Sequence, residues 1–171
     1  MKKIFLFLLI LASACKTTKH NNDFRGIKWG ASKDEVIKAE GREPDNIEGE
    51  FLVYATTLNK VPMMLGYRFA GDRLATATYI PQNAGNMPKE INEAYVSISD
   101  SLNKVYGASN DSLMDNGTKV RKTWQTPSTE IHIIYYMQSF MLEYSSKMFR
   151  PMLVNEPQPA IEEEEEQQGE E

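Results

Sequence analysis

The sequence predicts an α+β protein built around an antiparallel sheet, with helices packed on one face. Two observations support this fold class. Two stretches with helical periodicity are each followed by three runs in which apolar and polar residues alternate, as they do in strands. Short turns join the runs within each set, and such turns connect antiparallel neighbours. Because an antiparallel sheet can bury one face and leave the other to solvent, we expect the helices to cover the buried face.

The first helix is predicted over residues 33–40. Ser32 stands three residues before Glu35, which is the spacing of a capping box at a helix N-terminus. Gly41 follows where a left-handed C-terminal cap is favoured, and Pro44 prevents the helix from continuing.

Three strands are predicted next, over residues 51–58, 63–70 and 73–80. The first run is rich in aromatic and β-branched residues, which favour strands. Gly71-Asp72 suits a two-residue turn between the other two runs, because glycine accepts the positive φ that this turn needs. Alternation predicts one shared face for Leu65, Tyr67 and Phe69 in the second run, and one for Leu74, Thr76, Thr78 and Ile80 in the third.

A longer helix is predicted to begin near Pro88 and to end before Gly107. Its apolar residues recur at spacings of four and three, which places them in one stripe: Ile91, Tyr95, Ile98, Leu102 and Val105. Three further strands are predicted over residues 119–126, 130–136 and 140–146. The apolar face of the last strand consists of Phe140, Leu142 and Tyr144.

The order of one helix and three strands therefore occurs twice. It predicts two α-β-β-β pseudo-repeats, at residues 24–81 and 86–148, within one globular domain at residues 24–152. A domain of this length can bury a core without the help of disulfides.

The charges of the chain are unevenly distributed. Seven of the 24 acidic residues lie in the last ten positions, whereas residues 15–161 carry 17 basic and 17 acidic side chains. A neutral body without a basic cluster argues against nucleic acid as a partner. Residues 153–171 are low in complexity and acidic, so we expect this tail to be disordered.

Residues 1–14 have the features of a signal peptide. Lys2 and Lys3 precede nine uncharged residues, 4–12, and small residues stand before position 15. Nine residues are too few to cross a bilayer, which takes about 20 helical residues. The single cysteine of the chain, Cys15, follows directly and has no partner for an internal disulfide.

The stretch Leu11-Ala12-Ser13-Ala14-Cys15 resembles the lipobox of bacterial lipoproteins, with Ala12 where that family prefers leucine. The resemblance implies cleavage before Cys15, with a diacylglyceryl group on its sulfur and an acyl chain such as palmitate on its amine. Two or three such chains anchor a protein firmly to a membrane. Residues 15–23 are then the lipidated cysteine and a polar tether. The alternative is a plain signal peptide followed by an incidental cysteine.

The location that this resemblance implies is the bacterial cell envelope. Lys16 follows the cysteine where an inner-membrane retention signal would have aspartate. The outer membrane is therefore favoured over the inner one, with the domain facing the periplasm or the surface.

A second motif, Gly26-Ile27-Lys28-Trp29-Gly30-Ala31-Ser32, precedes the first helix. With Val36 and Gly41 it resembles the opening of small lipoproteins of the SmpA/OmlA type, although Ala31 replaces the usual methionine. The unit of a helix followed by antiparallel strands is also similar to the tandem repeats of β-lactamase-inhibitor-like proteins. These resemblances imply a non-catalytic module that binds a partner.

The residues contain no recognisable catalytic, cofactor-binding or metal-binding motif. His20 falls in the tether and His132 in a strand, where a hydrogen-bonded structural role is favoured. Asp34 and Glu35 suit the N-terminal dipole of the first helix better than a catalytic pair. We therefore predict no catalytic residue, no cofactor and no metal, and Cys15 as the one site residue, for lipidation.

The segment with Asp111, Asp115 and Asn116 has two interpretations. The three side chains suggest a calcium loop, but they lack the spacing and the closing glutamate of an EF-hand. A solvated hairpin loop is therefore favoured.

Aromatic residues are numerous for the size of the chain. We expect most to lie in the core or in cross-strand pairs. If several lay on the open sheet face, they would instead form a patch for binding a protein or a glycan. The set comprises Tyr67, Tyr79, Tyr95, Tyr106, Tyr135, Tyr136, Tyr144 and Trp124.

The sequence favours a lipid-anchored envelope protein that binds or scaffolds a protein partner without catalysis. This hypothesis predicts an exposed apolar or aromatic patch on the sheet and no buried cluster of perturbed ionisable groups. One alternative is an envelope hydrolase or other enzyme, which requires a concave pocket with carboxylates or His132. A proteinaceous enzyme inhibitor is the other alternative.

Overall fold

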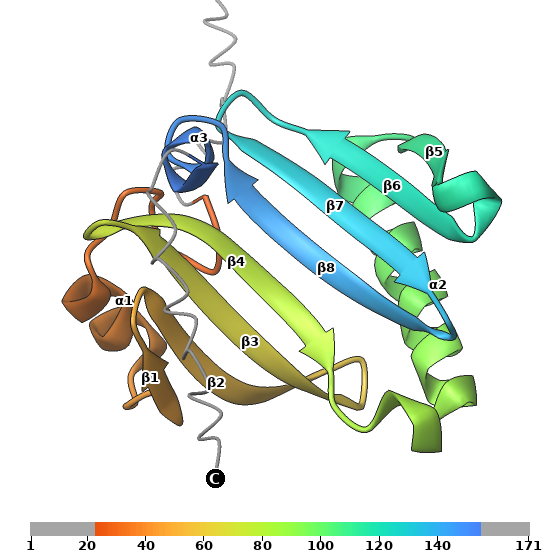
Figure 1. The fold of residues 1–171 in the computed structure, drawn as a ribbon, viewed down its shortest axis with the longest axis horizontal. Coiled ribbons are helices and arrows are strands. Elements are labelled where there is room, and N and C mark those ends of the chain that lie inside the picture. The colour runs from red at the N-terminus through yellow and green to blue at the C-terminus, as the bar shows by residue number, and fades with distance from the viewer. Residues whose placement is uncertain (1–22, 155–171) are drawn as a thin grey trace, which may run out of the picture.

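The structure, a computed structural model, describes residues 23–154. The predicted signal peptide, Cys15, His20 and the acidic tail from residue 155 lie outside these residues. Eight strands form one antiparallel sheet in the order β1-β2-β3-β4-β8-β7-β6-β5 (Figure 1). The predicted α+β class with an antiparallel sheet is confirmed.

The elements have the following bounds. The strands are β1 (Asn46–Glu48), β2 (Phe51–Leu58), β3 (Val61–Ala70), β4 (Arg73–Pro81), β5 (Asn110–Met114), β6 (Lys119–Gln125), β7 (Thr129–Tyr136) and β8 (Ser139–Ser146). The helices are α1 (Lys33–Glu40), α2 (Pro88–Tyr106) and α3 (Arg150–Val154), with two short 3₁₀ turns, η1 (Ala84–Asn86) and η2 (Asp115–Gly117).

Both long helices and six of the strands lie within two residues of their predicted bounds. Helix α1 has the predicted capping box, in which Ser32 accepts from the Glu35 amide and Glu35 accepts from the Ser32 amide. Gly41 ends it in the left-handed conformation. The structure adds β1, β5 and α3, so four strands, rather than three, follow each of the helices α1 and α2.

The two halves meet where β4 pairs with β8. Four residue pairs join these central strands, from Thr76 opposite Ser145 to Tyr79 opposite Leu142. Every other strand pair joins strands that are consecutive in the sequence.

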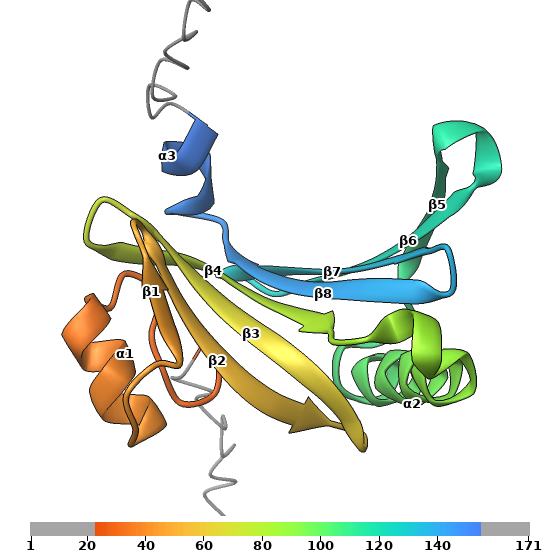
Figure 2. The ribbon, with the colours of Figure 1, turned by 60° about the horizontal axis from the view of Figure 1, so that its bottom comes forward.

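The two faces of the sheet differ. Figure 2 shows α1 and α2 below the sheet and α3 above it, so the expectation of helices on one face does not extend to α3. The face toward α1 and α2, here called the helix face, carries the core. Its fully buried side chains include Tyr54, Tyr67, Phe69, Ile91, Ile131, Ile133 and Leu142. The opposite face is here called the open face.

The predicted face of the third strand is wrong. The pairing of β3 with β4 shifts between Arg68 and Phe69, so that Arg68 lies opposite Thr76 but Phe69 lies opposite Leu74. The extra residue, Ala75, is a β-bulge, which changes the side to which the following side chains point. Leu74 therefore belongs to the core, whereas Thr76, Thr78 and Ile80 lie on the open face.

The apolar stripe of α2 is buried except at its end. Ile91, Ile98 and Leu102 are buried, but Val105 is exposed. The last turn of α2 contacts β6 through Trp124, whose indole N–H donates to Asn103 Oδ1 and to the Gly107 carbonyl, each at 3.1 Å. Val105 lies in this last turn, and its side chain is 68% exposed.

Residues 23–31, here called the N-terminal strap, connect both halves on the helix face. The Gly30 amide donates to the Leu74 carbonyl in β4 at 2.9 Å, and the Trp29 indole donates to Thr129 Oγ1 in β7 at 2.8 Å. Phe24 packs on aromatic rings from both central strands, with centroid distances of 4.8 Å to Tyr144 and 5.9 Å to Tyr79. The strap thus bridges the junction of β4 and β8.

Gly30 also sets the position of the segment that leads into α3. Its φ is +81°, and a Cβ built on it would lie 2.7 Å from two carbons of the Phe149 ring. Phe149 immediately precedes α3. A side chain at position 30 would therefore push this aromatic ring away from the strap.

We predict that Gly30→Ala lowers the free energy of unfolding by about 2–5 kcal/mol. The overlap with the Phe149 ring contributes about 1–3 kcal/mol, and the left-handed backbone adds about 1–2 kcal/mol. Urea unfolding measures the change. Gly49→Ala is the matched control, because Gly49 also has a positive φ, of +52°, but nothing lies within 4 Å of its Cβ position. An equal loss in both variants would show that the packing of Phe149 contributes nothing.

Candidate functional site: a groove on the open face

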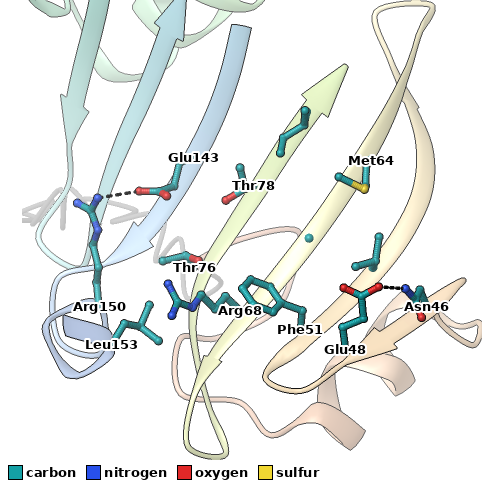
Figure 3. Close-up of a pocket in the computed structure, with 13 residues that line it drawn as sticks. Asn46, Glu48, Phe51, Met64, Arg68, Thr76, Thr78, Glu143, Arg150 and Leu153 are labelled. Atoms are coloured by element: carbon teal, nitrogen blue, oxygen red, sulfur yellow. Dashed lines mark hydrogen bonds and ion pairs between the residues drawn. The ribbon is translucent and has the colours of Figure 1, made fainter. Parts of the chain in front are cut away.

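A groove of about 590 Å³ lies on the open face. Its floor is formed by β3 and β4, where Gly66 lies opposite Thr78 and Arg68 lies opposite Thr76. Gly66 has no side chain, so the floor is lowered between its neighbours, and no atom lies within 4 Å of the place a Cβ would take. The two threonines present hydroxyl groups to this hollow (Figure 3).

The sides of the groove are mainly apolar. Strand β2 provides Phe51 and Val53, and α3 contributes Leu153 from the far side. Met64 and Ile80 lie opposite each other in β3 and β4, and their exposed fractions are 37% and 39%. The predicted exposed apolar patch on the sheet therefore exists, built mainly from aliphatic side chains.

Arg68 is the basic side chain at the centre of the groove. Its guanidinium lies 5.3 Å from the centre of the Phe51 ring, within the range of a cation–π contact. Nη2 lies 3.3 Å from Glu50 Oε1, and Nε is buried without a hydrogen-bond partner. Arg68 therefore keeps donor groups that no other described residue uses.

Arg150, the first residue of α3, fixes this helix above the sheet. Its Nη1 lies 3.3 Å from Glu130 Oε2 in β7, and its Nη2 lies 3.0 Å from Glu143 Oε1 in β8. The guanidinium is thus shared between two carboxylates, and α3 closes one end of the groove (Figure 3).

His132 belongs to the same network of side chains but does not line the groove. Its side chain is 8% exposed, and its Nε2 lies 3.1 Å from Glu130 Oε2. Its Nδ1 lies 3.1 Å from Thr123 Oγ1. If Nε2 donates to the carboxylate, Nδ1 accepts from the hydroxyl, so both ring nitrogens are occupied.

This geometry bears on the enzyme alternative. His132 is close to an acid, as that alternative requires, but Glu130 also binds Arg150 and Gln125. A general base needs a nitrogen within hydrogen-bond reach of a substrate. His132 is hydrogen-bonded through both ring nitrogens and its side chain is 8% exposed, which suits the structural role favoured by the sequence.

The expected loop around Asp111 and Asp115 is in part a strand. Residues 110–114 form β5, which pairs with β6 at the edge of the sheet. Asp111 Oδ2 accepts from Lys122 at 3.0 Å, and Asp115 forms an ion pair with Lys119. Among residues 23–154, no group of three His, Cys, Asp or Glu side chains is placed to hold a metal ion.

The aromatic residues lie mostly on the helix face. Tyr67, Tyr79 and Trp124 are buried, and Tyr95 packs on Tyr135 with a centroid distance of 4.6 Å. The prediction that most aromatic residues are core or cross-strand pairs is confirmed. Phe51, the aromatic ring of the groove, was not predicted from the sequence. Phe51 and Leu52 point to opposite faces of the sheet, and both are apolar, so the sequence could not show which of them lies on the open face.

One expectation is wrong: a buried cluster of perturbed ionisable groups exists, on the helix face. Two hydrogen bonds of 2.9 Å join the Arg25 guanidinium to the carboxylate of Glu40, whose side chain is 7% exposed. The Tyr67 hydroxyl donates to the same carboxylate. Burial and this hydrogen bond raise the pKa of Tyr67. Burial alone would raise the pKa of Glu40, but the hydrogen bonds from Arg25 and Tyr67 outweigh it and lower that pKa below 4.5.

The Glu40 cluster is a structural one. Tyr67 has no exposed surface, so a substrate has no access to its hydroxyl group. Arg25 stands in a left-handed conformation, with φ of +48°, in the tight turn between Phe24 and Ile27. The cluster therefore fixes the strap to the end of α1.

Comparisons with known proteins add little. No protein-family model matches the chain, and no curated protein matches it. One similar solved structure is that of a DUF4309 family protein, YjgB, from Bacillus subtilis, with 19% sequence identity and a TM-score of 0.44. The match covers 68% of this chain and 78% of that protein. A likeness of this degree carries no argument about the site.

Between residues 23 and 154, no helix is both long and apolar enough to cross a membrane.

We predict that Glu40→Gln lowers the free energy of unfolding at pH 7 by about 1–3 kcal/mol, because Arg25 and Tyr67 lose a charged acceptor. The pKa of Glu40 is lower in the folded state than in the unfolded chain. Its contribution is therefore complete above about pH 5 and is lost as the pH falls through the folded-state pKa. Urea unfolding between pH 7 and pH 3 should show that wild type and variant differ less in the free energy of unfolding as the pH falls.

The control is Glu43→Gln, which changes an exposed carboxylate just beyond α1. It should alter stability by less than about 0.5 kcal/mol. A Glu40→Gln protein as stable as the wild type at pH 7 would refute the structural role of the cluster.

Proposed function

We propose that the protein is a lipid-anchored, non-catalytic binding module of a bacterial envelope, and that it holds a protein partner on the open face. The observation that carries the proposal is the groove, whose volume of about 590 Å³ lies in the range of roughly 300–1,000 Å³ typical of binding pockets. Apolar walls with few polar groups suit binding, whereas the described residues that line the groove include no nucleophile paired with a base.

The anchor rests on Cys15 and the lipobox resemblance. Asp23 is the first described residue, and its carboxylate accepts from Ser128 Oγ at 2.6 Å, which ties the start of the domain to the loop before β7. Eight residue steps separate Cys15 from Asp23 and span at most about 26–29 Å. Lipid on Cys15 would therefore keep the domain close to the membrane, with the outer membrane favoured.

We also propose that the domain consists of two pseudo-repeats, residues 24–81 and 86–148. The element order supports this view, because a helix and four strands follow each other twice. The junction of β4 and β8 would then be the interface between the repeats, and the groove would lie next to it.

The partner that fits this surface is a protein of the envelope. A stable protein interface buries about 800 Å² on each partner, so it would extend from the groove over the neighbouring strands. An enzyme inhibitor would be one form of such a binding module. An envelope hydrolase with an unrecognised site is the alternative function.

We predict that crosslinking in the bacterial envelope captures a protein with the full-length wild type and not with Gly66→Leu. The leucine side chain would fill the groove without backbone strain, because the space above Gly66 is empty and its φ is not positive. Gly85→Leu is the matched control, since Gly85 is exposed, has equal space and lies away from the groove. Capture of the same protein by Gly66→Leu would contradict the groove as its binding site.

A further variant, Cys15→Ala, tests the anchor alone. Metabolic labelling with palmitate and membrane fractionation should show that this variant loses both the label and the membrane association. If it keeps both, the lipoprotein proposal is wrong.

A further inference from the structure

We infer that the groove is a binding site for a small anionic amphiphile. A carboxylate head group would lie beside Arg68, and an apolar chain would extend over Gly66 toward Met64 and Ile80. This inference goes beyond the proposed function and depends on neither the lipid anchor nor the protein partner.

The first support is the unused hydrogen-bonding capacity of Arg68. A guanidinium has five N–H groups, and the structure shows one hydrogen bond from this side chain, the 3.3 Å contact with Glu50. The side chain is 37% exposed, so its Nη groups are accessible from the groove. The cation–π contact with Phe51 restrains the guanidinium, whose planar fork of N–H groups matches a carboxylate.

The second support is that Arg150, the other cation of the groove, is already paired. Glu143 lies 3.0 Å from Arg150, which Glu130 also contacts, and Glu48 accepts from the amide of Asn46. Glu50 is the competitor for Arg68, but it is 38% exposed and can turn to water. Among the described residues that line the groove, Arg68 is therefore the cation available to an added anion.

The third support is the apolar path that starts at Arg68. Thr76 lies opposite Arg68, and Ile80 follows four residues later on β4, about 13 Å away at roughly 3.3 Å per residue. Gly66 keeps this path open, while Val53, Met64 and Ile80 provide exposed apolar surface along it. An apolar chain laid there would remove that surface from water.

The charge of the groove selects the head group. Two arginines and two glutamates line it, so its formal charge is zero. A doubly charged phosphate would face Glu48 and Glu143 without a second spare cation. A carboxylate carries one charge and matches the one available guanidinium.

Calorimetric titration of decanoate into the full-length protein, carrying Cys15→Ser to prevent lipid attachment, tests this inference. We expect saturable binding of one decanoate per chain. Arg68→Met should weaken it at least about tenfold, which corresponds to about 1.4 kcal/mol. Decanol, which lacks the carboxylate, should bind more weakly than decanoate by a similar factor, and acetate should not bind measurably.

Two variants complete the test. Arg121→Met is the matched control, because Arg121 also lies on the sheet with a buried, unpartnered Nε but does not line the groove. It should bind decanoate like the wild type, and Gly66→Leu should not bind it. Urea unfolding of each variant confirms that it is folded.

Three results would overturn the inference: no saturable binding of decanoate, equal binding by Arg68→Met, or equal binding of decanol. If decanoate fails to bind while Gly66→Leu still abolishes crosslinking to the protein partner, the inference is wrong and the proposed function stands. If decanoate binds as expected but no partner is captured, the inference stands and the proposed function is wrong.

Discussion

The pairing of β4 with β8 is the interaction on which the rest of the structure depends. It joins two four-stranded units through four residue pairs, and it is the strand pairing that brings together segments far apart in the sequence. All other pairings are local and close short loops, which costs little entropy. The central pairing has to be supported by contacts outside the two strands, and the molecule provides these on both faces of the sheet.

On the helix face the support is the N-terminal strap. Phe24 packs on rings from both central strands, while Gly30 and Trp29 form hydrogen bonds to different halves of the sheet. The glycine-rich motif that precedes α1 thus has a structural role beyond the start of a helix. Both Gly26 and Gly30 adopt a positive φ, which lets the chain turn tightly enough to stay on the junction.

On the open face the support is α3. Arg150 contacts Glu130 in β7 and Glu143 in β8, while α3 also contacts β3 and β4 of the other half. Phe149 reaches back to pack against Gly30. The helix is too short for its sequence to predict it, and its position depends on contacts with residues about 120 positions earlier. The strap and α3 therefore stabilise each other through the Gly30–Phe149 contact.

The sequence predicted the elements that have one buried face and missed those that have none. The bounds of α1 and β2 were correct because capping residues and β-branched runs are local signals. Strands β1 and β5 are edge strands with largely exposed residues, so no alternation marks them. The bulge at Ala75 inverted the predicted face of β4. The groove escaped prediction because it depends on that inversion and on a missing side chain, at Gly66.

The place of the groove links binding to the central pairing. Thr76 and Thr78 on its floor belong to β4, Glu143 on its side belongs to β8, and Leu153 belongs to α3. A ligand in the groove contacts β4 while it adjoins the strand and the helix that close the junction. Because a ligand that binds only the folded form adds its binding free energy to the stability, occupation of the groove would strengthen the central connection in the sheet. The bulge that moves Thr76, Thr78 and Ile80 away from the core would then make the open face both the proposed binding surface and a brace for the two halves.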